Sequence, residues 1–267
     1  MKYLGSKSRI AKDIIPFIQR AINDNHIENY YEPFCGGCNV IDKIKCKNRC
    51  ASDKNRYLIA LFQYMQDDGV LLEEVPRELY NDTRDNYNAK ATNIPDWYIG
   101  MIGFLASYNG RFFDGGYGAP VWENTKNGKR YRDYYKEAKN NLLSQMPNLQ
   151  DVNFSIKDYT EWNFDNLPTS VIYCDPPYAN TKQYETSKDF NYNEFWNYVR
   201  KWSMIHYVFV SEENAPDDFI PIWQREVSRS IKATDKSKST EKLFVYSNGL
   251  YTQKYTNSNG GSVNRLF

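Results

Sequence analysis

The chain of 267 residues is long enough for one large domain or two modest ones with a buried core. Its 41% hydrophobic and 25% charged residues are ordinary for a water-soluble globular protein, and its net charge of +1 excludes a global electrostatic signature of nucleic-acid binding. Any binding of nucleic acid must therefore come from local patches. The 16% aromatic content favours a surface that stacks flat ligands, although a tyrosine-rich core gives the same composition.

The sequence lacks a run of about 18 apolar residues, which a membrane-spanning helix requires. Its first residues also lack the apolar segment of a signal peptide. We therefore expect a cytoplasmic protein without membrane contact.

The first predicted element is a helix that follows a Gly-Ser-Lys turn. Ile10, Ile14 and Ile18 recur at helical spacing, with Ser6 as the expected N-cap. Pro16 falls inside this pattern and predicts a kink or a division of the helix. The turn itself can bind a carboxylate through free backbone N–H groups and the side chain of Lys7.

Two strands of an α/β sheet are predicted next, each with a characteristic end. The β-prone run from residue 29 ends in Gly36 and Gly37, and glycines there let the backbone approach a bound nucleoside. The run over 49–53 ends in Asp53, about 16 residues beyond, where a ribose diol is held in such folds. Because G-x-G-x-x-G is missing, an adenosine-containing cofactor other than a nicotinamide is favoured.

Four of the five cysteines form a cluster in the sequence, which raises a zinc site as an alternative. Cys35 and Cys38 bracket the glycine turn, whereas Cys50 opens a strand. We therefore expect that the thiols do not converge and that no metal is bound.

Residues 57–146 are predicted to form a helical lobe with an exposed loop over 107–118. In this loop Asn109 can pair with adenine, Arg111 can pair with guanine, and an aromatic ring can wedge into a base step. The alternative is a structural loop whose aromatic rings fill a small core.

Two segments carry an excess of basic residues. Residues 122–145 hold six basic residues against three acidic ones, although a solvated helix face has the same pattern. The six are Lys126, Lys129, Arg130, Arg132, Lys136 and Lys139. Residues 225–254 hold seven basic residues against three acidic ones. Within them, residues 232–240 are poor in apolar side chains and are predicted to form a loop between strands that can touch phosphates.

The sheet resumes at 152–156, and Asp158 and Tyr159 at its end are suited to bracket an adenine ring. A buried strand over 171–174 then stops in Asp175-Pro176-Pro177-Tyr178. The two prolines restrict the backbone and donate no N–H, so acceptors dominate the local chemistry. The Asp175 carboxylate and the Pro176 carbonyl suit the amine of a flat base, with Tyr178 on its face. The alternative is a proline turn with a surface aspartate.

The order of these motifs resembles that of the Dam-type DNA adenine-N6 methyltransferases. The resemblance extends from Lys2 to Tyr246 and implies a Rossmann-like α/β methyltransferase sheet with an inserted recognition lobe. Residues 1–56 and 147–267 would form the catalytic domain, and residues 57–146 the lobe with a DNA-reading hairpin or loop.

The resemblance also implies a cofactor and site residues. The cofactor would be S-adenosylmethionine, contacted by Tyr3, Lys7, Phe34, Gly36, Asp53, Asp158, Tyr159 and Asp175. The residues implied in DNA binding are Tyr108, Asn109, Arg111, Lys126 and Arg130. The catalytic motif would be Asp175, Pro176, Pro177 and Tyr178. The partner would be double-stranded DNA in a bacterial or phage-infected cell, bound by a monomer. Because residues 110–116 depart from better-known members, their recognition sequence is not transferred.

The expected reaction is methyl transfer to adenine N6 after the base is flipped out of the duplex. Cytosine N4 or an RNA amine remains an alternative, because the Asp-Pro-Pro-Tyr chemistry fits any planar exocyclic amine. A non-catalytic zinc-containing nucleic-acid-binding module is the alternative from a different class.

Overall fold

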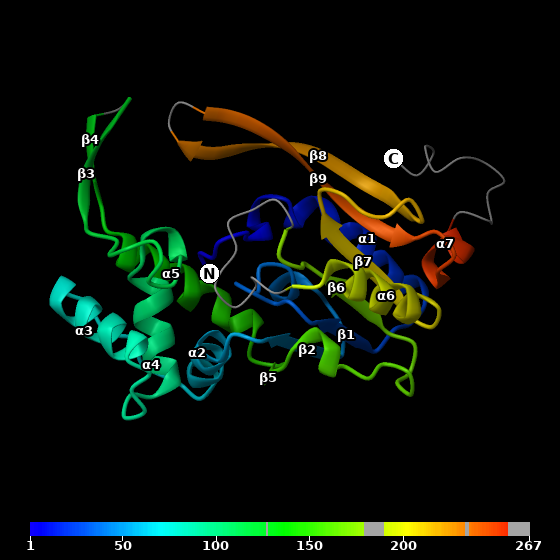
Figure 1. The fold of residues 1–267 in the computed structure, drawn as a ribbon, viewed down its shortest axis with the longest axis horizontal. Coiled ribbons are helices and arrows are strands. Elements are labelled where there is room, and N and C mark those ends of the chain that lie inside the picture. Colours follow the sequence, from blue (N-terminus) through cyan, green and yellow to red (C-terminus); the bar gives the residue numbers. More distant parts are fainter. Residues whose placement is uncertain (127, 179–189, 233–234, 256–267) are drawn as a thin grey trace. The chain divides into compact units, whose positions relative to one another are not determined.

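The fold is described from a computed structural model, for residues 1–126, 128–178, 190–232 and 235–255 (Figure 1). The chain forms two compact units. The helical unit comprises Met1–Ala11, Cys35–Lys43 and Asn55–Ile156. The sheet unit comprises Lys12–Phe34, Ile44–Lys54 and Lys157–Phe267.

The sheet unit is built on a mostly parallel sheet in the order β2-β1-β6-β7-β9-β8. Strands β2, β1, β6 and β7 are parallel, β9 is antiparallel to β7, and β8 is antiparallel to β9. Every residue of β6 and β7 is buried, and their apolar runs Val171–Cys174 and 207–210 are typical of a covered parallel sheet. The predicted Rossmann-like α/β class is confirmed. The bounds are β1 Asn29–Glu32, β2 Asn48–Asp53, β6 Val171–Cys174, β7 Tyr207–Glu212, β8 Phe219–Lys232 and β9 Asp235–Tyr246.

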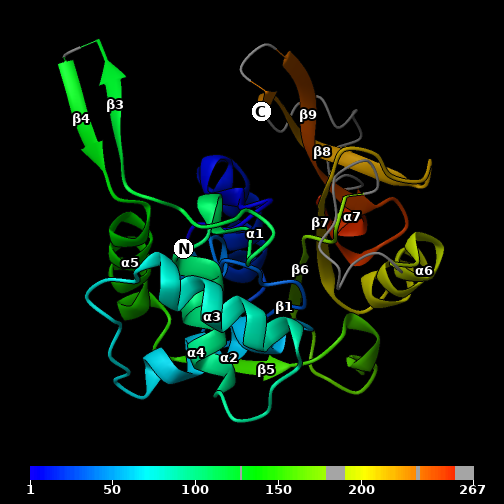
Figure 2. The ribbon, with the colours of Figure 1, turned by 60° about the vertical axis from the view of Figure 1, so that its left-hand side comes forward.

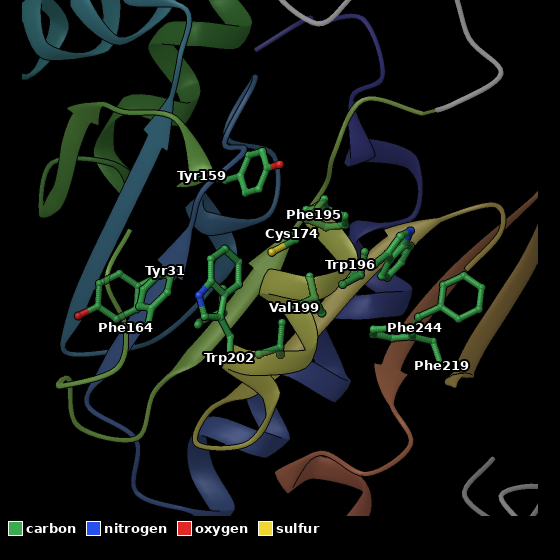
Figure 3. Packing of buried hydrophobic residues seen from close by; sticks show 13 residues of the cluster. Tyr31, Tyr159, Phe164, Cys174, Phe195, Trp196, Val199, Trp202, Phe219 and Phe244 are labelled. Atoms are coloured by element: carbon green, nitrogen blue, oxygen red, sulfur yellow. The ribbon is translucent and has the colours of Figure 1, made fainter. Parts of the chain in front are cut away.

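Helices cover both faces of this sheet. On one face α6 (Tyr192–Ser203) contributes Phe195, Trp196, Val199 and Trp202 to an aromatic cluster (Figure 3). Val208 and Val210 of β7 join this cluster, whereas Phe209 between them packs on Tyr251 of α7 (Leu250–Tyr255) with ring centroids 5.1 Å apart. Because side chains alternate along a strand, α6 and α7 lie on opposite faces.

Helix α1 (Ala11–Asp24) continues through Pro16 as a single helix, so the division that the sequence allowed does not occur. The proline removes one backbone donor, yet Ile14, Ile18 and Ala21 are fully buried on one face. Burial of this apolar face outweighs the lost hydrogen bond.

The C-terminal hairpin corrects one prediction. Residues 232 and 235–240 are not a loop, since β8 runs to Lys232 and β9 begins at Asp235. In Figure 1 the two strands run side by side as a long ribbon. Polar composition misled the prediction because a two-stranded ribbon does not need a buried face along its whole length.

The helical unit has an aromatic core, and its predicted helices are confirmed. Phe62 of α2 stacks on Phe154 of β5 at 5.0 Å, and Gln66 of α2 donates to the Val152 carbonyl at 2.8 Å. The elements are α2 Arg56–Gln66, α3 Arg77–Asn88, α4 Asp96–Gly100 with a following π-helix Met101–Leu105, β3 Val121–Thr125, β4 Gly128–Arg132, α5 Tyr134–Gln145 and β5 Val152–Ile156. Among the described residues, the helices are too short or too polar to cross a bilayer.

Candidate active site

The Asp175-Pro176-Pro177-Tyr178 motif directly follows β6, at the carboxyl edge of the parallel sheet. Strands β1 and β6 are neighbours with Tyr31 paired to Ile172, although about 140 residues separate them in the chain. The connection from β1 leads to β2 on one side, and β6 lies on the other. Such a switch in strand order opens the crevice in which ligands bind in α/β folds.

The motif is fixed from two sides. The Tyr192 hydroxyl, at the start of α6, donates to the Pro177 carbonyl at 2.6 Å. The Tyr178 hydroxyl donates to the Glu241 carboxylate of β9 at 2.5 Å, and the Tyr178 side chain is almost fully buried. Asp175 remains partly exposed. Burial, followed by the charges of Asp175 and Glu241, raises the pKa of Tyr178 well above its ordinary value, so its hydroxyl stays a donor at neutral pH.

Acidic and aromatic residues occupy the neighbouring strand ends of the sheet unit. Phe34 follows β1 and Asp53 ends β2, and these strands are paired in parallel register. Phe34 stacks on Tyr159 with centroids 5.4 Å apart and planes at 30°. Asp158 caps the short helix Tyr159–Glu161 by accepting from the Thr160 N–H at 3.0 Å. The sheet unit thus brings together carboxylates and an aromatic wall at one edge.

Of the residues expected near the cofactor in the helical unit, Tyr3 and Gly36 meet at the glycine turn. Gly36 has a φ of +44°, and a Cβ there would approach the Tyr3 ring to 2.9 Å. The turn therefore needs glycine at this position in order to pack on the N-terminal segment. The sequence alone did not reveal this reason for the glycine. Lys7 is buried in the short helix Lys7–Arg9, which Ser6 caps.

The family model described as D12 class N6 adenine-specific DNA methyltransferase matches residues 3–201. The chain belongs to this family.

Two curated relatives are a modification methylase and a type II methyltransferase. The chain is 25% identical to the modification methylase StsI of Streptococcus sanguinis over 198 residues, which are 68% of this chain. It is 23% identical to the type II methyltransferase M.FokI of Planomicrobium okeanokoites, again over 68% of the chain. The matched part spans only 28% and 29% of these relatives. Among solved structures, an rRNA methyltransferase, aviRa of Streptomyces viridochromogenes, aligns over 90% of this chain and 84% of that protein, with a TM-score of 0.39 and 9% identity.

In this D12-class chain the loop over 107–118 is a compact structural turn and not a hairpin. Tyr108 is exposed and Asn109 has a left-handed φ of 57°, whereas Arg111 pairs with Asp114 at 3.0 Å. Phe112 and Phe113 are buried and contact each other at 5.0 Å. The expectation that the aromatic rings of this loop are exposed is therefore wrong for both phenylalanines, which fill the core of the helical unit.

A hairpin does exist further along, at β3 and β4, and the sequence prediction missed it. Figures 1 and 2 show it as a two-stranded ribbon that extends away from α5. Lys126 and Arg130 are both exposed on it. The Asn-Gly pair at 127–128 was the available signal, because this dipeptide favours two-residue hairpin turns.

The base of the hairpin is tied to α5 by an ionic cluster. Arg132 donates to both oxygens of Glu137 at 2.9 and 3.1 Å, and Arg130 and Lys2 reach the same carboxylate at 3.3 and 2.5 Å. Although burial alone would raise it, hydrogen bonds from Arg132 and Lys2 leave the pKa of Glu137 below its ordinary value. The opposite face of the hairpin carries Trp122 and Tyr131, paired across the strands and both exposed.

The four clustered cysteines are divided between the two units. Cys38 donates to the Gly36 carbonyl at 3.9 Å, and Cys46 donates to the Ile27 carbonyl at 3.6 Å. Burial raises the pKa of the Cys46 and Cys50 thiols, which disfavours the thiolate form that zinc requires. Within the described ranges, His, Cys, Asp and Glu side chains form no group of three or more suited to a metal ion.

Proposed function

We propose that this chain transfers a methyl group from S-adenosylmethionine to adenine N6 in DNA. The observation that carries the proposal is the position of Asp175-Pro176-Pro177-Tyr178 at the end of β6, beside β1, in a chain of the D12 class. The family description names adenine in DNA, and the curated relatives are named a modification methylase and a type II methyltransferase, which supports methyl transfer to this substrate class.

The donor set at the sheet edge fits the proposed cofactor. A carboxylate at Asp53 suits a ribose diol, and the Phe34–Tyr159 pair offers an aromatic wall to an adenine ring. Asp158, and Tyr3, Lys7 and Gly36 of the helical unit, are proposed contacts by family resemblance. The bound cofactor supplies a methyl carbon made electrophilic by the adjacent positive sulfur.

The chain's own residues are proposed to act on the target amine. The Asp175 carboxylate and the Pro176 carbonyl accept hydrogen bonds from its two N–H groups, which draws the nitrogen toward tetrahedral geometry and frees its lone pair for attack on the methyl carbon. The methyl carbon would leave the sulfur as the N–C bond forms, and the nitrogen would then lose one proton to the Asp175 carboxylate or to water. Tyr178 stacks on the flipped base and offsets part of the few kcal/mol that extrusion costs. Lys126 and Arg130 would contact phosphates, and Tyr108, Asn109 and Arg111 would contact bases.

Asp175→Ala tests this proposal directly. We expect transfer of labelled methyl groups to DNA to disappear, while binding of S-adenosylhomocysteine survives at least in part, because the carboxylate acts on the amine. Asp165→Ala is the control, since Asp165 is a surface acid whose partner Lys201 is well exposed. Retained adenine-N6 methylation in the Asp175 variant would refute the assignment.

The target base is identified by digesting methylated DNA to nucleosides. N6-methyladenosine supports the proposal, whereas N4-methylcytosine or transfer to RNA alone supports the alternative amines. Methylation-sensitive sequencing of host DNA after expression then identifies the sequence in which the base lies.

A further inference from the structure

We propose that Glu241, on β9, is a positioning residue for the target base: its carboxylate anchors Tyr178 by the hydroxyl and so fixes the face on which the base stacks. The inference rests on the proposed function, and it adds a residue that lies outside the Asp-Pro-Pro-Tyr motif.

The backbone and the side chain of Tyr178 differ in how they are held. Two prolines precede it, so its backbone has little freedom, and the Tyr192 hydroxyl holds the Pro177 carbonyl at 2.6 Å. The hydrogen bond from the Tyr178 hydroxyl to Glu241 Oε2, at 2.5 Å, holds the far end of the ring.

The hydrogen bond is of the strong kind. The Tyr178 side chain is only 9% exposed, and its acceptor is a carboxylate, so the bond is charge-assisted and poorly screened by water. Because burial and two neighbouring carboxylates raise the pKa of Tyr178, the hydroxyl keeps its proton at neutral pH and remains the donor. A phenylalanine would stack equally well on a base, but it would lose this anchor.

The anchor point is itself fixed within the sheet unit. Glu241 is paired across the strands with Arg225 of β8, and Arg225 donates to Asp13 of α1 at 2.7 Å. On the other side, Lys242 next to it is in register with Glu212 of β7. The carboxylate is therefore presented by a strand that is paired on both edges.

Four variants separate positioning from a general structural effect, on an oligonucleotide that contains the sequenced target site. Glu241→Ala should lower kcat/KM for DNA about tenfold to a hundredfold, the value of a hydrogen bond to a charged group. Tyr178→Phe should lower it by a similar factor, and the double variant should be no worse than either single one. Glu241→Gln keeps an acceptor and should restore most of the activity. Glu226→Ala, which removes a carboxylate from the same hairpin, should resemble the wild type.

A spectroscopic measurement reports the ring directly. With 2-aminopurine in place of the target adenine, a flipped base that stacks on an ordered ring has quenched emission. Glu241→Ala and Tyr178→Phe should both give brighter complexes than the wild type. Affinity for S-adenosylhomocysteine without DNA should be unchanged in both.

The outcomes are distinguishable. If Glu241→Ala matches the wild type in turnover and fluorescence, or if its loss adds to that of Tyr178→Phe, the inference is overturned while the proposed function stands. If the wild type transfers no methyl group to DNA, the proposed function itself fails. If Glu241→Ala does not fold, Glu241→Gln and Tyr178→Phe test the inference instead. Poor activity of Glu241→Gln together with full activity of Tyr178→Phe contradicts the role of Glu241 as an anchor.

Discussion

Two glycines in the loop over 107–118 share a left-handed backbone but not their surroundings. Gly110 and Gly116 have φ values of +67° and +69°. A Cβ on Gly110 would come within 2.5 Å of the Lys2 carbonyl oxygen, whereas nothing lies within 4 Å of a Cβ on Gly116. The first glycine is thus required by conformation and by space, the second by conformation only.

Gly110→Ala should therefore destabilise the protein more than Gly116→Ala. Both variants carry the backbone cost of about 1–2 kcal/mol, and overpacking adds about 1–3 kcal/mol to the first. Urea unfolding of the two variants and the wild type measures the difference. Equal losses would show that the N-terminal segment moves away without cost.

His206 predicts a dependence of stability on pH. Its side chain is buried, Nδ1 accepts from the Ser170 N–H at 3.1 Å, and Nε2 lies 3.0 Å from the Phe164 carbonyl. Burial lowers its pKa below the ordinary 6.5. As the pH falls, the unfolded chain therefore takes up a proton on His206 before the folded chain does. Below about pH 6.5 the free energy of unfolding should fall by up to about 1.4 kcal/mol for each pH unit. Unfolding free energies at pH 7.5 and 5.5 should differ less in His206→Gln, which preserves a donor and an acceptor.

The positions of two proposed site residues in the fold were predictable from local sequence. Asp175 directly follows β6, where an apolar run meets two prolines, and Asp53 is the last residue of β2. Glu241 and Tyr192 were not predictable, because each acts through a hydrogen bond between elements far apart in the chain. Composition does not encode such pairings.

Among the elements, the β3–β4 hairpin has two faces with different tasks. Arg132 faces Glu137 of α5, whereas Lys129 is exposed beside the Trp122–Tyr131 pair on the other face. The first face attaches the hairpin to the helix. The second is free of that ionic cluster and presents an aromatic pair with a cation.

Arg132→Ala and Lys129→Ala should consequently affect different properties, the first stability and the second DNA binding. Arg132→Ala should lower the melting temperature and speed proteolysis at the hairpin, because it removes a bidentate ion pair that is about three-quarters shielded from water. Lys129→Ala should leave stability unchanged but reduce the salt dependence of DNA binding by about one unit of slope. The inverse pattern would contradict this division of the faces.

The elements missed by prediction were those with little apolar periodicity. The exposed β3–β4 hairpin buries no face, and the distal part of β8–β9 is polar in sequence, so the strand pattern is absent from both. Phe112 and Phe113 were instead predicted to be exposed, because their neighbours in the sequence are rich in glycine. Their burial follows from contacts with distant rings such as Tyr57 and Tyr87.

At the scale of the whole molecule, ligand binding should stabilise the folded chain. S-adenosylhomocysteine at one hundred times its Kd should add about 2.7 kcal/mol to the unfolding free energy, with or without EDTA. Asp53→Asn should weaken binding about tenfold and reduce the gain at the same concentration by about 1.3 kcal/mol. A shift that depends on metal would support the zinc alternative instead.

Gln145, the last residue of α5, donates to the Gly37 carbonyl at 3.1 Å and to the Cys38 carbonyl at 2.8 Å. About 108 residues separate the two ends of these bonds, so the glycine turn acquires its support only after the ribosome has completed α5. A chimera in which a relative's residues replace 57–146 of this chain would lose this support. Such a chimera should therefore retain Gln145, although the rest of α5 comes from the relative.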